Sequence, residues 1–292
     1  MSLIVPVRNA VACLPAFMAA LTSQRWHGTW QVVVADNGST DGTAELAHEV
    51  GRGLPELQVV DASAKEGAAY ARNTGVSHAD GRALLFLDVD DLPDHGYLEA
   101  MGEALLENDL VCSRIDVDAV NPPWATALRR SPQVDGPGDY LFFLPYAGGN
   151  SLGMRRDLFD SLGGFDERLR IAEDVDLCWR AQLAGARLAF VSDAVVHYSF
   201  PPTPVAMFEQ ARSWGDAEAR LQHAYRDYGA RVPWRETYYR WRRIVRHLPR
   251  LRHRAGRAWW LTQLGNSVGR IQGIARGTLR GASILRGPRG DD

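Results

Sequence analysis

Cysteine is scarce in this chain of 292 residues. The three cysteines, Cys13, Cys112 and Cys178, are widely spaced and form no C-x-x-C pair. An odd and scattered set of this kind indicates neither a disulfide framework nor a zinc site. We therefore expect a reducing, cytoplasmic setting.

Long hydrophobic runs are absent as well. No segment holds about 18 consecutive uncharged apolar residues, and the first residues carry no basic stretch followed by a long apolar one. We expect no secretory signal, and any membrane contact should be peripheral. The composition, 46% hydrophobic and 23% charged, is typical of a globular protein with one large domain or one domain plus an appendage.

Acidic residues are nearly missing from the C-terminal part of the chain. Residues 226–290 carry 16 arginines against two acids, whereas residues 1–225 carry 17 lysines and arginines against 31 acids. A basic segment of this kind indicates an anionic partner. No recognition motif accompanies the arginines, so we expect no nucleic acid. One hypothesis is peripheral contact with anionic membrane through Trp241, Trp259, Trp260 and neighbouring arginines. A helical lid packed on the acidic body is the alternative.

Short apolar runs alternate with longer helical stretches through about residue 118. This rhythm predicts an α/β fold with a mostly parallel, doubly wound sheet, whose ligands bind beyond the carboxyl ends of the strands. We expect strands at 3–7, 30–35, 57–60, 84–87 and 110–117, and helices at 10–23, 43–50, 68–79 and 96–108. Residues 119–147, rich in proline and glycine, predict a long irregular connection. Beyond it we expect helices at 155–162, 174–183 and 204–228, strands at 188–191 and 195–196, and further helical segments after residue 233.

An acidic cluster follows the fourth apolar run. Asp88, Asp90 and Asp91 come directly after Leu84–Leu87. Like charges so close repel one another, and in an apolar setting they take up protons or need a cation. Mg²⁺ or Mn²⁺ is commonly held by one or two carboxylates together with substrate phosphates, so the cluster is a candidate metal site. A polar loop in which Asp91 or Asp94 caps the next helix is the alternative.

Other polar residues are expected near the same edge of the sheet, where the strands end. Asp36 could accept hydrogen bonds from a nucleobase or ribose, or could belong to an Asx-rich turn. Arg72, on the helix that opens after Gly67, could reach a phosphate or base, or form a surface salt bridge. Gly149 and Asn150 lie in a turn that could bring backbone amides to a ligand, or could be a plain turn.

A second acidic group opens the expected helix at 174–183. At about 100° per residue, Glu173, Asp176 and Arg180 share one face, which predicts an ordinary ion pair between Asp176 and Arg180 on a solvated surface. Asp174 falls on the apolar face, where it could serve as a general base for an alcohol or simply cap the helix. His197, at the exit of a short strand, could be a metal ligand or a structural residue.

Taken in order, these segments resemble family 2 glycosyltransferases of the GT-A fold, over about residues 3–200. By this resemblance, Pro6, Arg8, Asp36, Ser39 and Arg72 would line the nucleotide pocket. Asp88 and Asp90 would hold Mn²⁺ or Mg²⁺ and the ribose, and His197 matches a position that touches the metal in some members. Asp174 would be the general base, and Glu173, Gly149 and Asn150 would belong to the substrate site. The matching segments are residues 4–9, 36–43, 67–75, 87–91, 148–150 with 155–156, 163–167 and 173–177.

The resemblance implies an inverting transfer by single displacement. The donor would be a nucleoside-diphosphate sugar, and the acceptor a hydroxyl of a cell-envelope glycan or lipid-linked saccharide. Residues 1–203 would form the catalytic domain, with a nucleotide-binding half at 1–118 and an acceptor half at 119–203. Residues 204–292 would be a helical, basic extension, which the resemblance does not cover beyond about residue 205. The expected location is the cytoplasm, or the inner face of the cell membrane.

Two other interpretations remain open. A strand ending in D-x-D also opens haloacid-dehalogenase-type phosphatases, but these expect threonine or valine where Leu92 stands, and a lysine later in the chain than Lys65, the only lysine present. A non-catalytic nucleotide-sugar or glycan binder is the other alternative, although it would need no base at Asp174.

Overall fold

The computed structural model describes residues 1–128, 131 and 133–279. The chain divides into two compact units. The first comprises Met1–Asp116, Pro132–Gly138 and Pro145–Tyr198, and the second comprises Val117–Ser131, Asp139–Leu144 and Ser199–Asp292. Residues 280–292, which the sequence assigns to the C-terminal extension, lie outside the described residues.

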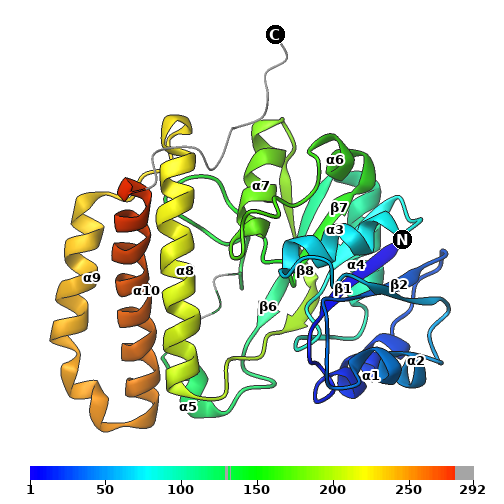
Figure 1. Cartoon of the computed structure of the whole chain (residues 1–292), viewed down its shortest axis with the longest axis horizontal. Helices are drawn as coiled ribbons and strands as arrows, with labels where there is room; N and C mark the ends of the chain where they lie inside the picture. Colours follow the sequence, from blue (N-terminus) through cyan, green and yellow to red (C-terminus); the bar gives the residue numbers. More distant parts are fainter. Residues whose placement is uncertain (129–130, 132, 280–292) are drawn as a thin grey trace. The chain divides into compact units, whose positions relative to one another are not determined.

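The first unit is built on an eight-stranded sheet with the order β3-β2-β1-β4-β7-β6-β8-β5 (Figure 1). Strands β1 to β4 run parallel to their neighbours within this group. β7 is antiparallel to both β4 and β6, β6 is parallel to β8, and β5 is antiparallel to β8. The strands are β1 Ser2–Val7, β2 Gln31–Asp36, β3 Leu57–Asp61, β4 Ala83–Phe86, β5 Leu92–Pro93, β6 Leu110–Asp116, β7 Leu152–Arg155 and β8 Leu188–His197. The predicted α/β fold is confirmed, and β8 is one strand where two short ones were expected.

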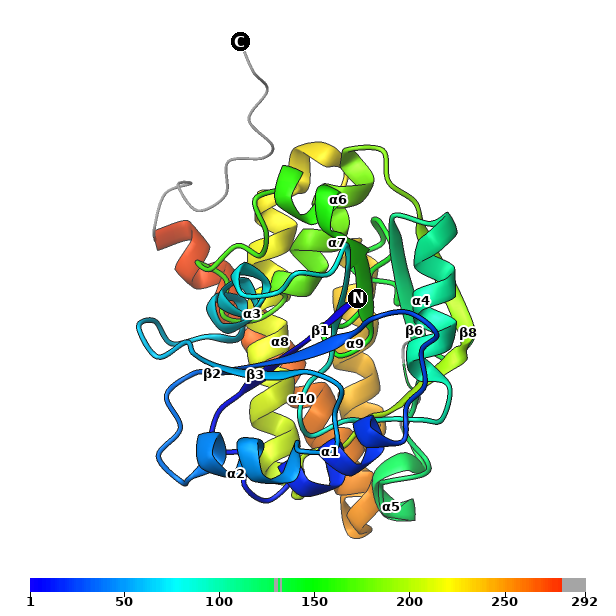
Figure 2. The same ribbon diagram turned by 90° about the vertical axis from the view of Figure 1, so that its right-hand side faces the viewer.

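Helices cover both faces of this sheet, and the strands are apolar on both sides for that reason. Leu3, Val5 and Val7 of β1 pack in the cluster that includes α1 Leu14–Thr22 and α4 Tyr97–Glu107, whereas Ile4 packs with residues of α3. Figure 2 shows α1 and α2 on one side of β1, β2 and β3, with α3 on the other. The other helices of the unit are α2 Thr43–Val50, α3 Ala68–Ser77, α6 Arg156–Ser161 and α7 Glu173–Leu183.

The first helix begins four residues later than the sequence predicts. Pro15 is the second residue of α1, where its missing N–H and fixed φ suit the first turn. Asn9 has a φ of 53°, and the backbone N–H of Ala10 donates to Oγ1 of Thr43 at 2.8 Å. This turn ties the exit of β1 to the loop that follows β2, so two strand ends are held together at the edge where ligands are expected.

The regular elements described in the second unit are helices, joined by turns and irregular segments. Thr203 caps α8 by accepting a hydrogen bond from the backbone N–H of Ala206, and Pro204 is the first residue of this helix. Within the described residues no helix has both the length and the apolar character to cross a membrane. The helices are α5 Pro123–Thr126, α8 Pro204–Ala224, the 3₁₀ turn η1 Arg226–Tyr228, α9 Trp234–Arg246, the 3₁₀ turn η2 Leu248–Arg252 and α10 Arg254–Leu279.

α8 and α10 approach each other closely along glycines spaced four apart (Figure 1). A Cβ at Gly265 would lie 2.4 Å from the carbonyl oxygen of Phe208, and one at Gly269 would lie 1.9 Å from that of Arg212. Side chains larger than hydrogen would therefore force the two helices apart. Beside this contact, the buried carboxylate of Glu218 forms ion pairs with Arg270 and Arg240.

Candidate active site

The acidic cluster lies where β4 ends. The carboxylates of Asp88, Asp90 and Asp91 offer oxygen atoms that all lie within 4.8 Å of one another. Asp88 is half-buried, Asp90 is exposed and Asp91 is buried. Desolvation, and to a smaller extent the like charge of Asp88, raise the pKa of Asp90. Closely spaced carboxylate oxygens are suitable ligands for Mg²⁺ or Mn²⁺, so the group fits the predicted metal.

Asp91 also faces the loop before β7. Its Oδ2 accepts a hydrogen bond from Nδ2 of Asn150 at 2.5 Å, and both side chains are buried. The helix α4 is preceded instead by Gly96 in the left-handed region, with no side-chain cap, so the prediction that Asp91 or Asp94 caps it is wrong. Asp91 thus fixes the loop 148–150 to the acidic cluster, and the amide of Asn150 points to protein rather than to an open surface.

Arg72 lies between the two acidic groups. Its Nη2 donates to Asp88 at 2.7 Å and its Nη1 donates to Glu173 at 2.6 Å. Only 3% of Arg72 is exposed, so the interpretation as a surface salt bridge is wrong. Burial alone would lower the pKa of Arg72, but the charges of Asp88, Glu173 and Asp174 outweigh that effect and raise it. One guanidinium is therefore shared among three carboxylates.

Gly149 lies directly against this guanidinium. A Cβ at position 149 would lie 2.6 Å from Nη2 of Arg72. The backbone N–H of Gly149 donates to Oδ2 of Asp174 at 2.7 Å. The absence of a side chain thus lets one loop contact both the cation that holds Asp88 and the predicted base.

Asp174 is the second residue of α7, which begins after Ala172 with a φ of 65°. Oδ1 of Asp174 accepts from the backbone N–H of Val175 at 2.8 Å, and its Oδ2 faces Gly149. Desolvation raises the pKa of Asp174 and of Glu173, although Arg72 acts in the opposite direction on both. Glu173 is buried and Asp174 is half-buried, and two adjacent acids with one cation retain protons more readily than free carboxylic acids do. Glu173 faces Arg72, and its place in the substrate site stays a prediction.

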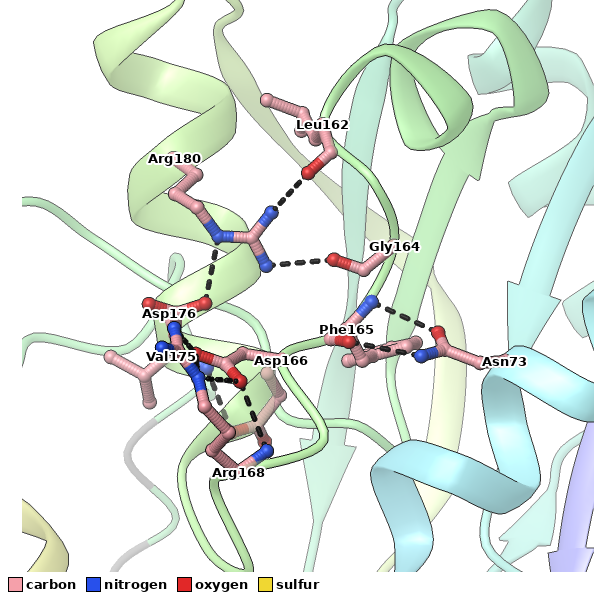
Figure 3. A network of polar contacts seen from close by, with 10 residues as sticks. Asn73, Leu162, Gly164, Phe165, Asp166, Arg168, Val175, Asp176 and Arg180 are labelled. Atoms are coloured by element: carbon pink, nitrogen blue, oxygen red, sulfur yellow. Dashed lines mark hydrogen bonds and ion pairs between the residues drawn. The ribbon is translucent and has the colours of Figure 1, made fainter. Parts of the chain in front are cut away.

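The expected solvated face of α7 is in fact buried. Asp176 is 2% exposed, and its Oδ2 accepts from Nε of Arg180 at 2.8 Å. Arg180 also donates to the carbonyl oxygens of Leu162 and Gly164, at 2.9 and 2.8 Å (Figure 3). The predicted ion pair is confirmed, but its expected place on a solvated surface is wrong, because the turn at 162–166 covers this side of the helix.

The same turn reaches Arg72 through Phe165. The side chain of Asn73 accepts from the backbone N–H of Phe165 and donates to its carbonyl oxygen, both at 2.9 Å (Figure 3). The ring of Phe165 lies 5.5 Å from the guanidinium carbon of Arg72. Asn73, Asp176 and Arg180 were not among the predicted site residues, and nothing in the local sequence indicates that Asn73 pairs with Phe165, 92 positions away.

The predicted nucleotide residues lie at the ends of β1 and β2. Oδ1 of Asp36 accepts from the backbone N–H of Ser39 at 2.9 Å, which is the predicted Asx turn, and Oγ of Ser39 accepts from that of Asn9 at 2.9 Å. Arg8 is half-exposed and pairs with Glu66 at 2.5 Å. Pro6 is half-buried within β1. These residues share the strand edge with the acidic cluster, and their nucleotide contacts stay a prediction.

His197 is the last residue of β8, beside Leu92 of β5. Its Nδ1 lies 2.9 Å from Oδ2 of Asp116, and its Nε2 lies 3.8 Å from Oδ1 of Asp94. The close carboxylate group found among the described residues consists of Asp88, Asp90 and Asp91 and does not include this ring. A metal contact of His197 therefore stays a prediction.

Comparison with known families places this site in a defined class. Residues 2–163 match the model of the family Glycosyl transferase family 2. The chain belongs to this family. Residues 83–267 of this family 2 glycosyltransferase also match Glycosyl transferase family group 2. Both the family and the fold exclude the dehalogenase-type phosphatase.

Several curated relatives are similar over much of the chain. Glycosyltransferase AglE of Haloferax volcanii is 29% identical over 197 residues, covering 66% of this chain and 65% of the relative. Pre-mycofactocin glycosyltransferase of Mycobacterium tuberculosis is 26% identical over 303 residues, covering 99% and 58%. A PGL/p-HBAD biosynthesis glycosyltransferase of Mycobacterium bovis is 30% identical over 179 residues, covering 60% and 66%. The chain thus spans about three fifths of the length of these relatives.

Solved structures confirm the GT-A type of fold. The mannosyltransferase PcManGT of Pyrobaculum calidifontis, in complex with GDP-Man and Mn²⁺, has a TM-score of 0.68 at 18% identity, covering 94% of this chain and 87% of that one. TarS of S. aureus, residues 1–349 in complex with UDP-GlcNAc, has a TM-score of 0.55 at 18% identity, covering 94% and 91%.

Proposed function

We propose that this chain is a metal-dependent, inverting hexosyltransferase. It would move a sugar from a nucleoside-diphosphate sugar to a hydroxyl group of a cell-envelope glycan or lipid-linked saccharide. The supporting observation is that Arg72, which donates to Asp88 at 2.7 Å, lies against Gly149, whose backbone N–H donates to Asp174 at 2.7 Å. A non-catalytic binder would not need a desolvated acid next to a metal-type cluster.

The donor half of the site is the strand edge with the acidic cluster. In this proposal Asp88 and Asp90 hold Mn²⁺ or Mg²⁺, and Pro6, Asp36 and Ser39 line the nucleotide pocket. When bound, the ion offsets the charge that builds on the departing diphosphate. The hydrogen bond from Arg72 keeps the Asp88 carboxylate in place, so that this carboxylate needs little reorganisation when the donor binds.

The acceptor half is the start of α7 with the loop 148–150. Asp174 takes the proton of the acceptor hydroxyl as its oxygen attacks the anomeric carbon. A raised pKa makes this carboxylate a stronger base than a free aspartate, and the backbone N–H of Gly149 fixes its orientation. Attack from the side opposite the diphosphate inverts the anomeric centre without a covalent intermediate.

The proposal keeps the predicted arrangement of the chain. Residues 1–203 form the catalytic domain, with the nucleotide half at 1–118 and the acceptor half at 119–203, and residues 204–292 form an extension. Its proposed setting is the cytoplasm or the inner face of the cell membrane. The sugar, the nucleotide and the acceptor are to be identified first.

The test is a screen of nucleotide sugars by thermal shift, with Mn²⁺, Mg²⁺ or EDTA, followed by assays of nucleoside-diphosphate release with glycan and lipid-linked acceptors. The donor should raise the melting temperature by an amount that grows with the logarithm of its concentration divided by its Kd. We expect metal-dependent release that needs an acceptor. A chain that binds a donor but transfers its sugar to none of the acceptor classes, at enzyme and substrate concentrations that saturate binding, would contradict the proposal.

A further inference from the structure

Helix α9 packs on one side only. Ile244 is buried, its carbonyl oxygen accepts from Nε1 of Trp260 at 2.9 Å, and Arg240 reaches the carboxylate of Glu218. At about 100° per residue, the side opposite Ile244 is the line through Arg235, Arg242 and Arg246. All three of these arginines are exposed.

These outward arginines differ from two nearby arginines that have partners. Arg243 donates to Gln263 at 2.6 Å, and the guanidinium of Arg250 lies 4.7 Å from the ring of Trp259. Arg235, Arg242 and Arg246, in contrast, have no ion pair or hydrogen bond to any side chain in the part of the chain that the structure describes. Glu236 is the acidic residue of α9, and residues 237–279 contain no other.

Large apolar side chains flank the arginine line. Trp234 is 76% exposed, Val245 is 63% exposed and Tyr238 is 57% exposed. Tyr239 is exposed as well. Exposed aromatic and aliphatic side chains gathered on one face mark an interaction site. We call this set, with the three arginines, the outer face of α9.

The tryptophans named from the sequence do not form this face. Trp241, Trp259 and Trp260 are half-buried. Trp260 donates to the backbone of Ile244, and Trp259 lies against Arg250. Trp259 and Trp260 thus link α10 to α9 and η2, and the proposal below uses different residues.

We propose that the outer face of α9 docks on an anionic lipid surface. Arg235, Arg242 and Arg246 would meet the headgroup phosphates, while Trp234 and Tyr238 enter the interfacial layer. Arginine charge alone would suit any polyanion, but exposed tryptophan, tyrosine and valine beside it favour a membrane over a nucleic acid. This inference rests on the membrane setting proposed above and not on the transfer reaction.

The test is flotation of the full chain with vesicles of phosphatidylcholine alone or mixed with phosphatidylglycerol, at low and high salt. We expect binding to the mixed vesicles only, weakened by salt. Each outward arginine should contribute about fivefold to partitioning, so the variant Arg235→Gln/Arg242→Gln/Arg246→Gln should bind about 100-fold more weakly. The corresponding triple lysine variant should retain binding.

A matched control removes the same charge elsewhere. Arg52, Arg82 and Arg187 are exposed residues of the first unit, and the triple glutamine variant at these positions should bind as the unchanged protein does. Equal binding by the two glutamine variants would overturn the proposal, because net charge alone would then explain the effect. Failure of the full chain to bind anionic vesicles, including the case in which it binds RNA instead, would also overturn it. Donor turnover with a water-soluble acceptor, measured in parallel, reports on the proposed function separately.

Discussion

Replacing Arg72 by glutamine should destabilise the protein and disconnect the two acidic groups. The side chain is 3% exposed and donates to Asp88 and Glu173 at 2.7 and 2.6 Å. Removing one partner of a buried ion pair typically costs about 3–5 kcal/mol, because the remaining charge is left uncompensated. With about 2–4 °C per kcal/mol for a domain of this size, we expect a melting temperature roughly 10 °C lower.

The loss should depend on pH in a defined direction. Without Arg72, the pKa values of Glu173 and Asp174 should rise further above their ordinary values of 4.5 and 3.8. Carboxylic acids with raised pKa values bind more protons in the folded state than in the unfolded state. Stability therefore falls as the pH rises from the unfolded-state pKa to the higher folded-state pKa. Arg72→Gln should therefore be most destabilised near pH 8 and should recover part of its stability near pH 5.

Urea unfolding at several pH values measures this effect, and Arg156→Gln is a matched control. Arg156 donates to the carbonyl oxygens of Gly81, Val76 and Ala79 and to no carboxylate that the structure describes. Its loss should destabilise the protein equally at pH 5 and pH 8. A change of under 1 kcal/mol in Arg72→Gln, or a loss that matches the control at every pH, would refute the shared-cation account.

Three further results are expected. Gly149→Ala should lower kcat by at least about tenfold with little loss of donor binding. The added Cβ would lie 2.6 Å from Nη2 of Arg72 and would push the loop away from Asp174. Turnover within twofold of that of the unchanged protein would argue against this. In the unchanged protein kcat/KM should fall at acidic pH, with a midpoint above the ordinary aspartate pKa of 3.8, because a protonated Asp174 cannot accept a proton. A kcat/KM that stays constant down to pH 4 would exclude Asp174 as the base. EDTA should abolish transfer and Mn²⁺ should restore it in the unchanged protein but not in Asp90→Asn; full activity in EDTA would exclude the metal.

The sequence predicts the fold well because the fold depends on local signals. Apolar runs of strand length, followed by helices that begin after glycine or proline, place β1 to β4 with small errors at the ends. The acidic residues after Phe86 and at the start of α7 are also visible, because charge next to buried strand or helix residues is unusual.

The contacts that join these groups could not be predicted in the same way. Asp91 and Asn150 are 59 positions apart, and Arg72 and Glu173 are 101 apart, so no local pattern connects them. Helical periodicity identified which residues share a face with Asp176 but not that a distant turn covers that face. The same limit explains why the sequence analysis placed Trp241, Trp259 and Trp260 at the membrane surface. Composition shows that these tryptophans are present, but not which side chains α9 exposes.

The central claim is that the Asp88 cluster and Asp174 act as two halves of one site, with different tasks. Donor affinity and transfer rate, measured together for Asp174→Asn, test it most directly. The account predicts donor binding within about threefold of the unchanged protein and transfer reduced by at least about 1,000-fold. Equal turnover by Asp174→Asn, or loss of donor binding in parallel with activity, would contradict it.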